Sequence, residues 1–228
     1  MKEFFSLIWV KRTMLVIAIL LMWQIGGYAL RCQAKSDSLE ILAPISRNAK
    51  IEIEGIKKLS LVSNSDKDRL ISLFNTLENR KQQHKNAFLI FYPYHFTAAS
   101  LLLILSSISV VLIFLIAQTG LNNVSGSMKT IFFTMAALTS FYAFSPSVFK
   151  LESNISVNLS EYILYDNLEQ EIYNYAVTKT CSETPDDSLS FGKFHSKIVK
   201  DMAKINSIDV TFDYKIIPMP DYGLDKQH

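Results

Sequence analysis

The side chains that most often carry out chemistry are sparse in this sequence and form no recognisable site. The four histidines are dispersed along the chain: His84, His95, His195 and His228. No His-x-x-x-His or Cys-x-x-Cys spacing occurs, so the sequence predicts no zinc site. His95, beside Tyr94, is typical of an anchor at a membrane surface, and Asp186 and Asp187 are typical of solvated loop carboxylates. Because catalysis needs groups that converge on one point, we expect no enzyme activity, no metal and no cofactor.

The two cysteines, Cys32 and Cys181, are the remaining reactive side chains. Exactly two apolar blocks separate them, so both are expected on the same side of a membrane, where an oxidising compartment would allow them to pair. Cys32 follows an apolar block by two residues, whereas a continuous helix from 151 to 180 would carry Cys181 about 45 Å away. Two unpaired thiols are therefore the favoured interpretation, and a disulfide that folds the tail back is the alternative.

Three apolar blocks dominate the organisation of the chain. The sequence is 49% hydrophobic and 19% charged, and the excess apolar residues gather in 13–30, 96–117 and 130–149. Each block has the length that crosses a hydrocarbon layer of roughly 30 Å. Lys129 is the only charge between His95 and Lys150, whereas a soluble helix of such length would keep a polar stripe. The sequence therefore predicts a transmembrane helical hairpin, with spans 96–117 and 130–149 joined by a short polar loop, 118–129.

The first block has two interpretations. It follows a basic N-terminus, residues 1–12, and spans 13–30 without a charge. A retained anchor helix is favoured, and the alternative is a cleaved signal peptide that ends at Ala34, with Cys32 three positions before the cut. Arg31 excludes a lipoprotein signal, because a small residue is expected before the cysteine.

The polar segments 31–95 and 150–228 are expected on the same side of the membrane, whether or not the first block is retained. Within about 15 residues of the span ends, five Lys and Arg residues flank these segments, against four at the N-terminus and hairpin loop. That count leaves the side open, and the basic N-terminus before a signal-like span slightly favours an inside N-terminus with outside polar segments.

The hairpin spans contain small and hydroxylated residues in place of charges. The absence of charges from these spans argues against an ion-coupled transporter or a proton relay. Small residues let helices approach closely, and each hydrogen bond between helices adds roughly 0.6–2 kcal/mol. The residues expected at a helix-packing or oligomer interface are Ser106, Ser109, Ala136, Thr139, Ser140 and Ala143. Two interpretations stay open: packing within the hairpin, and self-association around a pore lined by serine and threonine.

The polar segments are expected to extend the hairpin as paired helices. In 31–95, the alternation of residues 51–54 favours a short strand or an extended linker, and Ser65 with Asp68 favours a capped helix over about 65–90. The segment 150–180 has helical periodicity. Pro93 and Pro146 are expected to bend the two arms at one depth, within an aromatic girdle at the membrane surface. The tail 181–228 is expected to hold a linker, an amphipathic helix over 191–205 and a strand over 208–217.

Together these features predict an all-α integral membrane protein: a transmembrane hairpin with an N-terminal anchor helix, extended by paired extramembrane helices and a small C-terminal α+β tail. The expected function is that of a non-catalytic scaffold, subunit or assembly factor that binds a protein partner through the extramembrane helices. The alternative is a self-assembling pore or membrane-disrupting effector. The expected partners are the lipid bilayer and either another protein or further copies of the chain. Nucleic acid is not expected, because the net charge is only +2 and lysines alternate with carboxylates.

Overall fold

The computed structural model describes residues 2–45, 49–58, 63–178 and 190–206. Every regular element in these ranges is an α-helix, so the all-α class is confirmed for the described part of the chain. The strand expected at 208–217 lies outside the described residues, as do Cys181, Asp186, Asp187 and His228. The tail contributes one described helix, α6 (Phe191–Asn206), where an amphipathic helix was expected.

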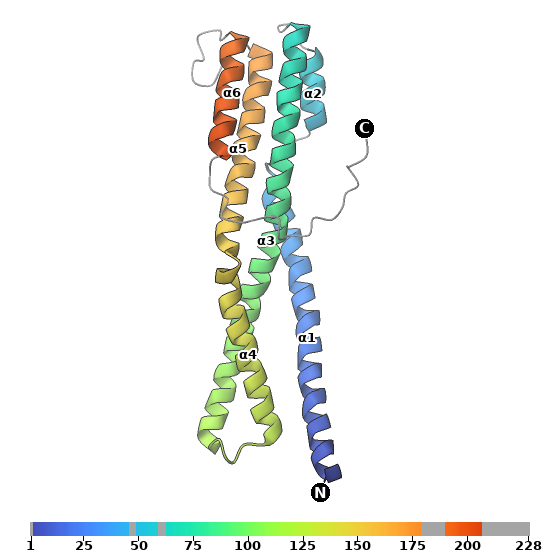
Figure 1. Ribbon diagram of the computed structural model, residues 1–228, viewed down its shortest axis with the longest axis vertical. Coiled ribbons are helices and arrows are strands. Elements are labelled where there is room, and N and C mark those ends of the chain that lie inside the picture. Colours follow the sequence, from blue (N-terminus) through green and yellow to red (C-terminus); the bar gives the residue numbers. More distant parts are fainter. Residues whose placement is uncertain (1, 46–48, 59–62, 179–189, 207–228) are drawn as a thin grey trace.

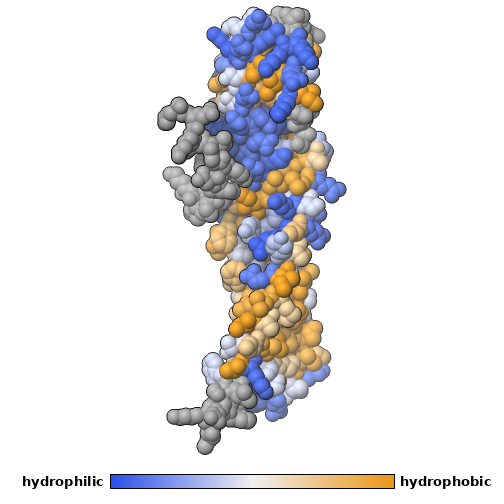
Figure 2. Space-filling model, turned by 90° about the vertical axis from the view of Figure 1, so that its right-hand side faces the viewer, coloured by the Kyte–Doolittle hydropathy of each residue, from blue (hydrophilic) through white to orange (hydrophobic). Residues whose placement is uncertain are grey.

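The molecule is a long rod in which three helices are long and apolar enough to cross a membrane. At one end, α1 (Lys2–Leu42) runs beside a hairpin formed by α3 (Asn64–Thr119) and α4 (Gly126–Val148) (Figure 1). At the other end, α5 (Leu151–Thr178) and the first half of α3 lie side by side, and α6 and the short α2 (Ala49–Lys58) pack beside them. We call this second end the distal bundle. Figure 2 shows hydrophobic side chains concentrated over the hairpin half and hydrophilic side chains over the distal half.

The hairpin half exposes its apolar side chains. None of the 23 residues of α4 is buried, and α1 and α3 also present large apolar side chains outward, such as Ile25 and Leu103, which are 70% and 71% exposed. The three helices contact one another at particular points. Gly27 of α1 lies against Thr97 and Leu101 of α3, where a Cβ atom would be 3.6 Å from the Leu101 side chain. This exposure is the pattern that a lipid environment favours.

The distal bundle has a continuous hydrophobic core of its own. Leu70, Phe74 and Leu77 of α3 recur at intervals of four and three residues, the spacing that places side chains on one helix face. They pack against α5, and α6 contributes Phe194, whose ring stacks on Tyr175 with the centroids 3.9 Å apart. Aromatic and aliphatic burial of this kind stabilises the distal bundle by roughly 25 cal/mol for each Å² removed from water.

Residues 51–54 form part of helix α2, so the expected strand or extended linker is wrong. Ala49, Ile53 and Ile56 follow helical spacing and face the core, whereas Ile51 is 67% exposed. The alternation of isoleucine and glutamate suggested the two-residue repeat of a strand, but of Ile51 and Ile53 only Ile53 packs inward. Burial at positions 49, 53 and 56 therefore outweighs the β propensity of isoleucine.

The N-cap of helix α3 lies two residues earlier than the sequence predicts. Ser63, not Ser65, is the N-cap: its Oγ accepts a hydrogen bond from the Asp66 backbone N–H at 3.2 Å and donates one to the Asp66 carboxylate at 2.7 Å. From there α3 continues for 56 residues, passing through Pro93 without ending. The expected helix over 65–90 and the expected span 96–117 are therefore parts of one helix.

The other arm is interrupted between α4 and α5. Phe149 and Lys150 separate the two helices, and Lys150 has a φ of 47°, a left-handed value rarely adopted by residues with a side chain. The Asn154 side chain donates a hydrogen bond to the Phe149 carbonyl at 3.2 Å, which satisfies an acceptor exposed by the break. The two arms of the hairpin therefore enter the distal bundle differently, one continuous and one broken.

Candidate functional site

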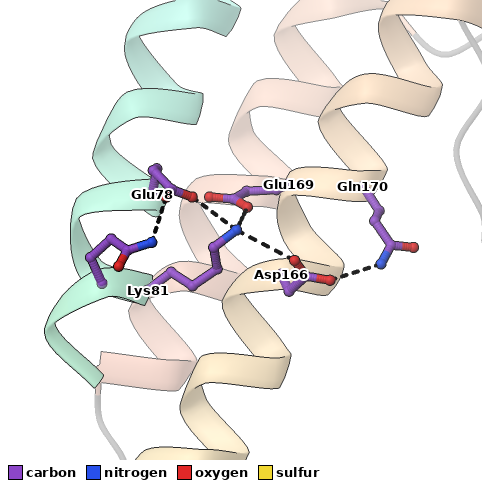
Figure 3. A network of polar contacts seen from close by, with 6 residues as sticks. Glu78, Lys81, Asp166, Glu169 and Gln170 are labelled. Atoms are coloured by element: carbon purple, nitrogen blue, oxygen red, sulfur yellow. Dashed lines mark hydrogen bonds and ion pairs between the residues drawn. The ribbon is translucent and has the colours of Figure 1, made fainter. Parts of the chain in front are cut away.

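The most unusual feature of the distal bundle is a set of charged side chains buried between α3 and α5 (Figure 3). Lys81 of α3 is 2% exposed, and Asp166 and Glu169 of α5 are 3% and 1% exposed. Glu78 completes the set from one turn earlier on α3. We call these four residues the lysine cluster. Lysine and carboxylates are almost never fully buried unless they are paired, so their pairing determines whether this interface is stable.

Lys81 lies at the centre of the lysine cluster. Its Nζ is 2.8 Å from Glu78 Oε2 and 3.4 Å from Asp166 Oδ1, and it also donates to Glu169 Oε2. Two amides support the carboxylates from outside: Gln82 donates to Glu78 at 2.8 Å and Gln170 donates to Asp166 at 3.0 Å. Each of these amides lies four residues from its carboxylate, which is the spacing of neighbours on a helix surface.

The environment shifts the pKa of three members of the lysine cluster. Burial raises the pKa of Glu169 to about 8, against the opposing effect of Lys81, and Glu78 adds to the rise. Burial also acts to raise the pKa of Glu78, but hydrogen bonds from Lys81, Glu169 and Gln82 outweigh it, so this pKa lies below its ordinary value. Burial lowers the pKa of Lys81, and its bonds to Glu169 and Glu78 more than reverse this. At neutral pH Lys81 is therefore charged, Glu78 is ionised and Glu169 is mostly protonated.

A second polar group lies one turn along α3, toward the hairpin half. His84 Nδ1 is 2.7 Å from Glu161 Oε2 and 3.0 Å from Asn158 Oδ1, so this nitrogen faces two acceptors and carries a hydrogen. The ring stacks on Tyr165 with a centroid separation of 5.5 Å. The Tyr165 hydroxyl donates to Asn206 Oδ1 at 2.6 Å, which ties α5 to the end of α6. Burial, followed by the Glu161 charge, raises the pKa of Tyr165.

The contacts of the lysine cluster join α3 to α5 and leave Lys81 fully engaged with carboxylates. The ammonium of Lys81 fills the place among three carboxylates that a metal ion would need, and no group of residues in the described ranges has the composition of a metal site. Polar residues at buried helix contacts fix which residues lie opposite one another, because a shifted pairing would leave charges unpaired. The lysine cluster therefore defines the register of α3 against α5.

The lysine cluster was not predicted from the sequence, although a signal was present. One face of α3 in this region follows a four-three alternation of residues that are buried, or half-buried at His84: Leu70, Phe74, Leu77, Lys81, His84, Phe88 and Phe91. Lys81 and His84 occupy positions where apolar residues are the rule for paired helices. A lysine and a histidine on the apolar face were therefore visible, but their partners, 85 and 74 residues away, were not.

The residues expected at a helix-packing interface are only partly brought together in the single chain. Ser109 and Thr139 meet across the hairpin, with their hydroxyl oxygens 3.5 Å apart. Ser106 and Ala136 are half-buried. Ser140 and Ala143 are exposed, and the Ser140 hydroxyl donates to the Ala136 carbonyl of its own helix.

The two prolines lie inside helices. Pro93 is buried within α3, and Pro146 lies two residues before the end of α4. Pro146 lacks an N–H for the carbonyl of Tyr142, and the Ser145 hydroxyl lies 3.5 Å from that oxygen and takes over as donor. The bends expected at both prolines remain predictions.

Three further residues have defined surroundings. His95 is half-buried, and its Nδ1 is buried without a hydrogen-bond partner. His195 packs on Phe191, with the ring centroids 5.8 Å apart. Cys32 is an exposed free thiol.

Comparison of the chain with protein-family models, with curated proteins and with solved structures finds no match.

Proposed function

We propose that this protein is a membrane-anchored helical scaffold, a non-catalytic subunit or assembly factor that holds a partner-binding bundle at a fixed distance from a lipid bilayer. The observation that carries this proposal is the continuity of α3, which runs without a break from the distal bundle to the hairpin loop. Residues 64–95 of that helix rise about 48 Å, which sets the reach of the distal bundle beyond the membrane.

The buried contacts support a rigid spacer. The hydrophobic core and the lysine cluster fix α5 against α3, while α2 packs on both helices and α6 packs on α5. Charged groups that must stay paired resist sliding of the two helices, because any other register leaves an ion in a low-dielectric site. A spacer of this kind suits a protein whose role is to position another molecule.

The partner surface is expected on the outer faces of α2 and α6. Ile51 of α2 is 67% exposed and Val199 of α6 is 39% exposed. Photo-crosslinking residues at these two positions in the full-length protein, expressed in its native membrane, should each capture a discrete protein. The matched control is Phe133 of α4, 62% exposed in the hairpin half, where only lipid is expected. A strictly monomeric protein with no adduct at Ile51 or Val199 would contradict the scaffold.

The orientation we propose places the N-terminus and the hairpin loop inside the cell and the distal bundle outside. Arg12 of α1 lies directly against Gly126 at the start of α4, so the basic residues Lys11, Arg12 and Lys129 occupy one end of the rod. Short segments rich in lysine and arginine remain on the cytoplasmic side. Labelling of Cys32, which lies toward the distal bundle, by an impermeant thiol reagent should occur in intact cells. Labelling only after permeabilisation would reverse the orientation.

The exposed face of α4 favours a second candidate, a self-assembling pore. None of its residues is buried in the single chain, and the face includes Ser140 and Ala143. A pore predicts ion conductance in reconstituted liposomes that is abolished by Ser140→Leu and retained in Phe133→Leu, which changes an apolar residue for another. Liposomes that stay silent with the wild-type protein would exclude this candidate.

A further inference from the structure

The lysine cluster contains a buried carboxyl oxygen that lacks a donor. Glu169 is 1% exposed, and only its Oε2 contacts Lys81. Its other oxygen, Oε1, is buried and accepts no hydrogen bond from the protein. The Glu78 carboxyl, from the facing helix, binds the same Lys81 ammonium as Glu169, so the two carboxyl groups lie close together (Figure 3). Two carboxylates that approach this closely in a buried site repel each other unless one of them holds a proton.

We propose that Glu78 and Glu169 share one proton beside Lys81, and that its loss at alkaline pH loosens the contact of α3 with α5. The lysine cluster would thus act as a proton-dependent latch within the distal bundle. This inference does not depend on the partner or the orientation proposed above, because it concerns only the contact between these two helices.

The donor pattern assigns the proton to Glu169. Gln82 donates to Glu78 and Gln170 donates to Asp166, so each of those carboxylates has an amide donor as well as Lys81. Glu169 has the ammonium alone. With every carboxyl ionised, three negative charges would surround one positive charge. A proton on Glu169 reduces the imbalance and converts the contact with Glu78 into a hydrogen bond.

The charges that face Glu169 come from α3 and from its own helix. Lys81 of α3 is in contact with it, Glu78 of α3 binds the same ammonium, and Asp166 lies one turn away on α5. His84 and Glu161 form the next polar group along the same interface. Helix α6 presents Lys197, but that ammonium pairs with Glu171, which is two residues from Glu169 and so about 200° around α5. Helix α2 meets α5 at Gly55, where an added Cβ atom would lie 3.1 Å from the Tyr173 ring.

The direction of the pH effect follows from the raised pKa of Glu169. Between its ordinary value of 4.5 and about 8, the folded state holds one proton that the separated helices do not. The stabilisation is complete below 4.5 and is lost as the pH rises through 8, when the O–H bond of Glu169 breaks and its proton passes to water or a buffer base. For one proton, the equilibrium constant for separation of α3 from α5 rises by up to about tenfold per pH unit across this window.

The test compares wild-type protein with Glu169→Gln, whose amide can donate to Glu78 at every pH. Thermal unfolding of the full-length protein in one detergent is followed from about pH 5 to about pH 9, a range that brackets the pKa of Glu169. The wild-type midpoint should fall across this range, and the midpoint of E169Q should change much less. Glu171→Gln is the matched control, since it removes a carboxylate two residues away that pairs with Lys197, and it should keep the wild-type pH dependence.

Infrared spectroscopy of the wild-type protein keeps the test decisive if E169Q does not fold. The absorption of a protonated carboxylic acid should be present at pH 6, disappear as the pH rises through about 8, and persist unchanged in E171Q. Absence of that absorption from the wild-type protein, or a wild-type midpoint that is independent of pH, would overturn the proposal. An E169Q variant that keeps the full wild-type pH dependence would overturn it equally.

Discussion

Replacement of Lys81 by methionine tests how far the distal bundle depends on one buried cation. Methionine has nearly the length of the lysine stem, so Lys81→Met retains most of the packing and removes only the ammonium. The change leaves Glu78, Asp166 and Glu169 without their shared partner in an interface where Asp166 and Glu169 are almost fully buried. The variant should therefore be destabilised mainly by the unpaired carboxylates.

The expected size follows from the burial of the ion pair between Lys81 and Asp166, which remains when Glu169 is protonated. Removing one partner of a buried ion pair costs about 3–5 kcal/mol, much more than an exposed pair, because the remaining charge cannot be solvated. For a chain of 150–250 residues each kcal/mol lowers the unfolding midpoint by roughly 2–4 °C, so Lys81→Met should lower it by about 6–20 °C. The loss should change little with added salt, since buried pairs are weakly screened.

The assay is thermal unfolding by circular dichroism in one detergent, at pH 6, where Glu169 is protonated. Arg80→Met is the matched control: it removes the adjacent cation, which is exposed, and should shift the free energy of unfolding by less than about 0.5 kcal/mol. A Lys81→Met midpoint equal to that of Arg80→Met would refute the reasoning that the buried cation fixes this interface.

Two further substitutions test contacts elsewhere in the rod. Gly27→Val should weaken the contact of α1 with α3, because the added methyl groups extend from a Cβ only 3.6 Å from Leu101. Gly26→Val is the control and should not weaken it, because nothing lies within 4 Å of that Cβ position. Disulfide crosslinking between the two helices measures the difference, and equal yields would contradict the close approach. Tyr165→Phe should destabilise the distal bundle by about 1 kcal/mol through loss of the hydrogen bond to Asn206, and protease sensitivity of α6 should rise with it. Unchanged proteolysis of α6 would show that this bond does not hold the helix in place.

The apolar helices were predictable because length and the absence of charge are local properties of the sequence. Block 96–117 falls inside α3, and block 130–149 falls inside α4 except for its last residue. The junctions were harder to predict. Hydropathy changes sharply near residue 95 although α3 does not end there, because the backbone bonds of a helix are indifferent to whether its side chains meet water or lipid.

The failures concern long-range partners. Residues 51–54 were assigned to a strand or linker because the alternation of isoleucine and glutamate is visible locally, whereas the core that selects Ile53 and Ile56 is formed by distant helices. Lys81 appeared as one charge in a polar stretch, and its ion pair with Asp166, 85 residues later, depends on the return of the chain through the hairpin. Contacts of that separation are not encoded in any local window, so the candidate site emerged only from the fold.

The unequal joints of the hairpin have a mechanical consequence. With 56 residues and a rise of about 1.5 Å per residue, α3 is a lever roughly 84 Å long that no break interrupts. The other arm has a pivot at Phe149 and Lys150, where the backbone turns through a left-handed residue. A torque applied to the distal bundle would therefore turn α3 along its whole length, while α4 swings about that pivot. Such a pair converts a load at the tip into a change of angle between α3 and α4.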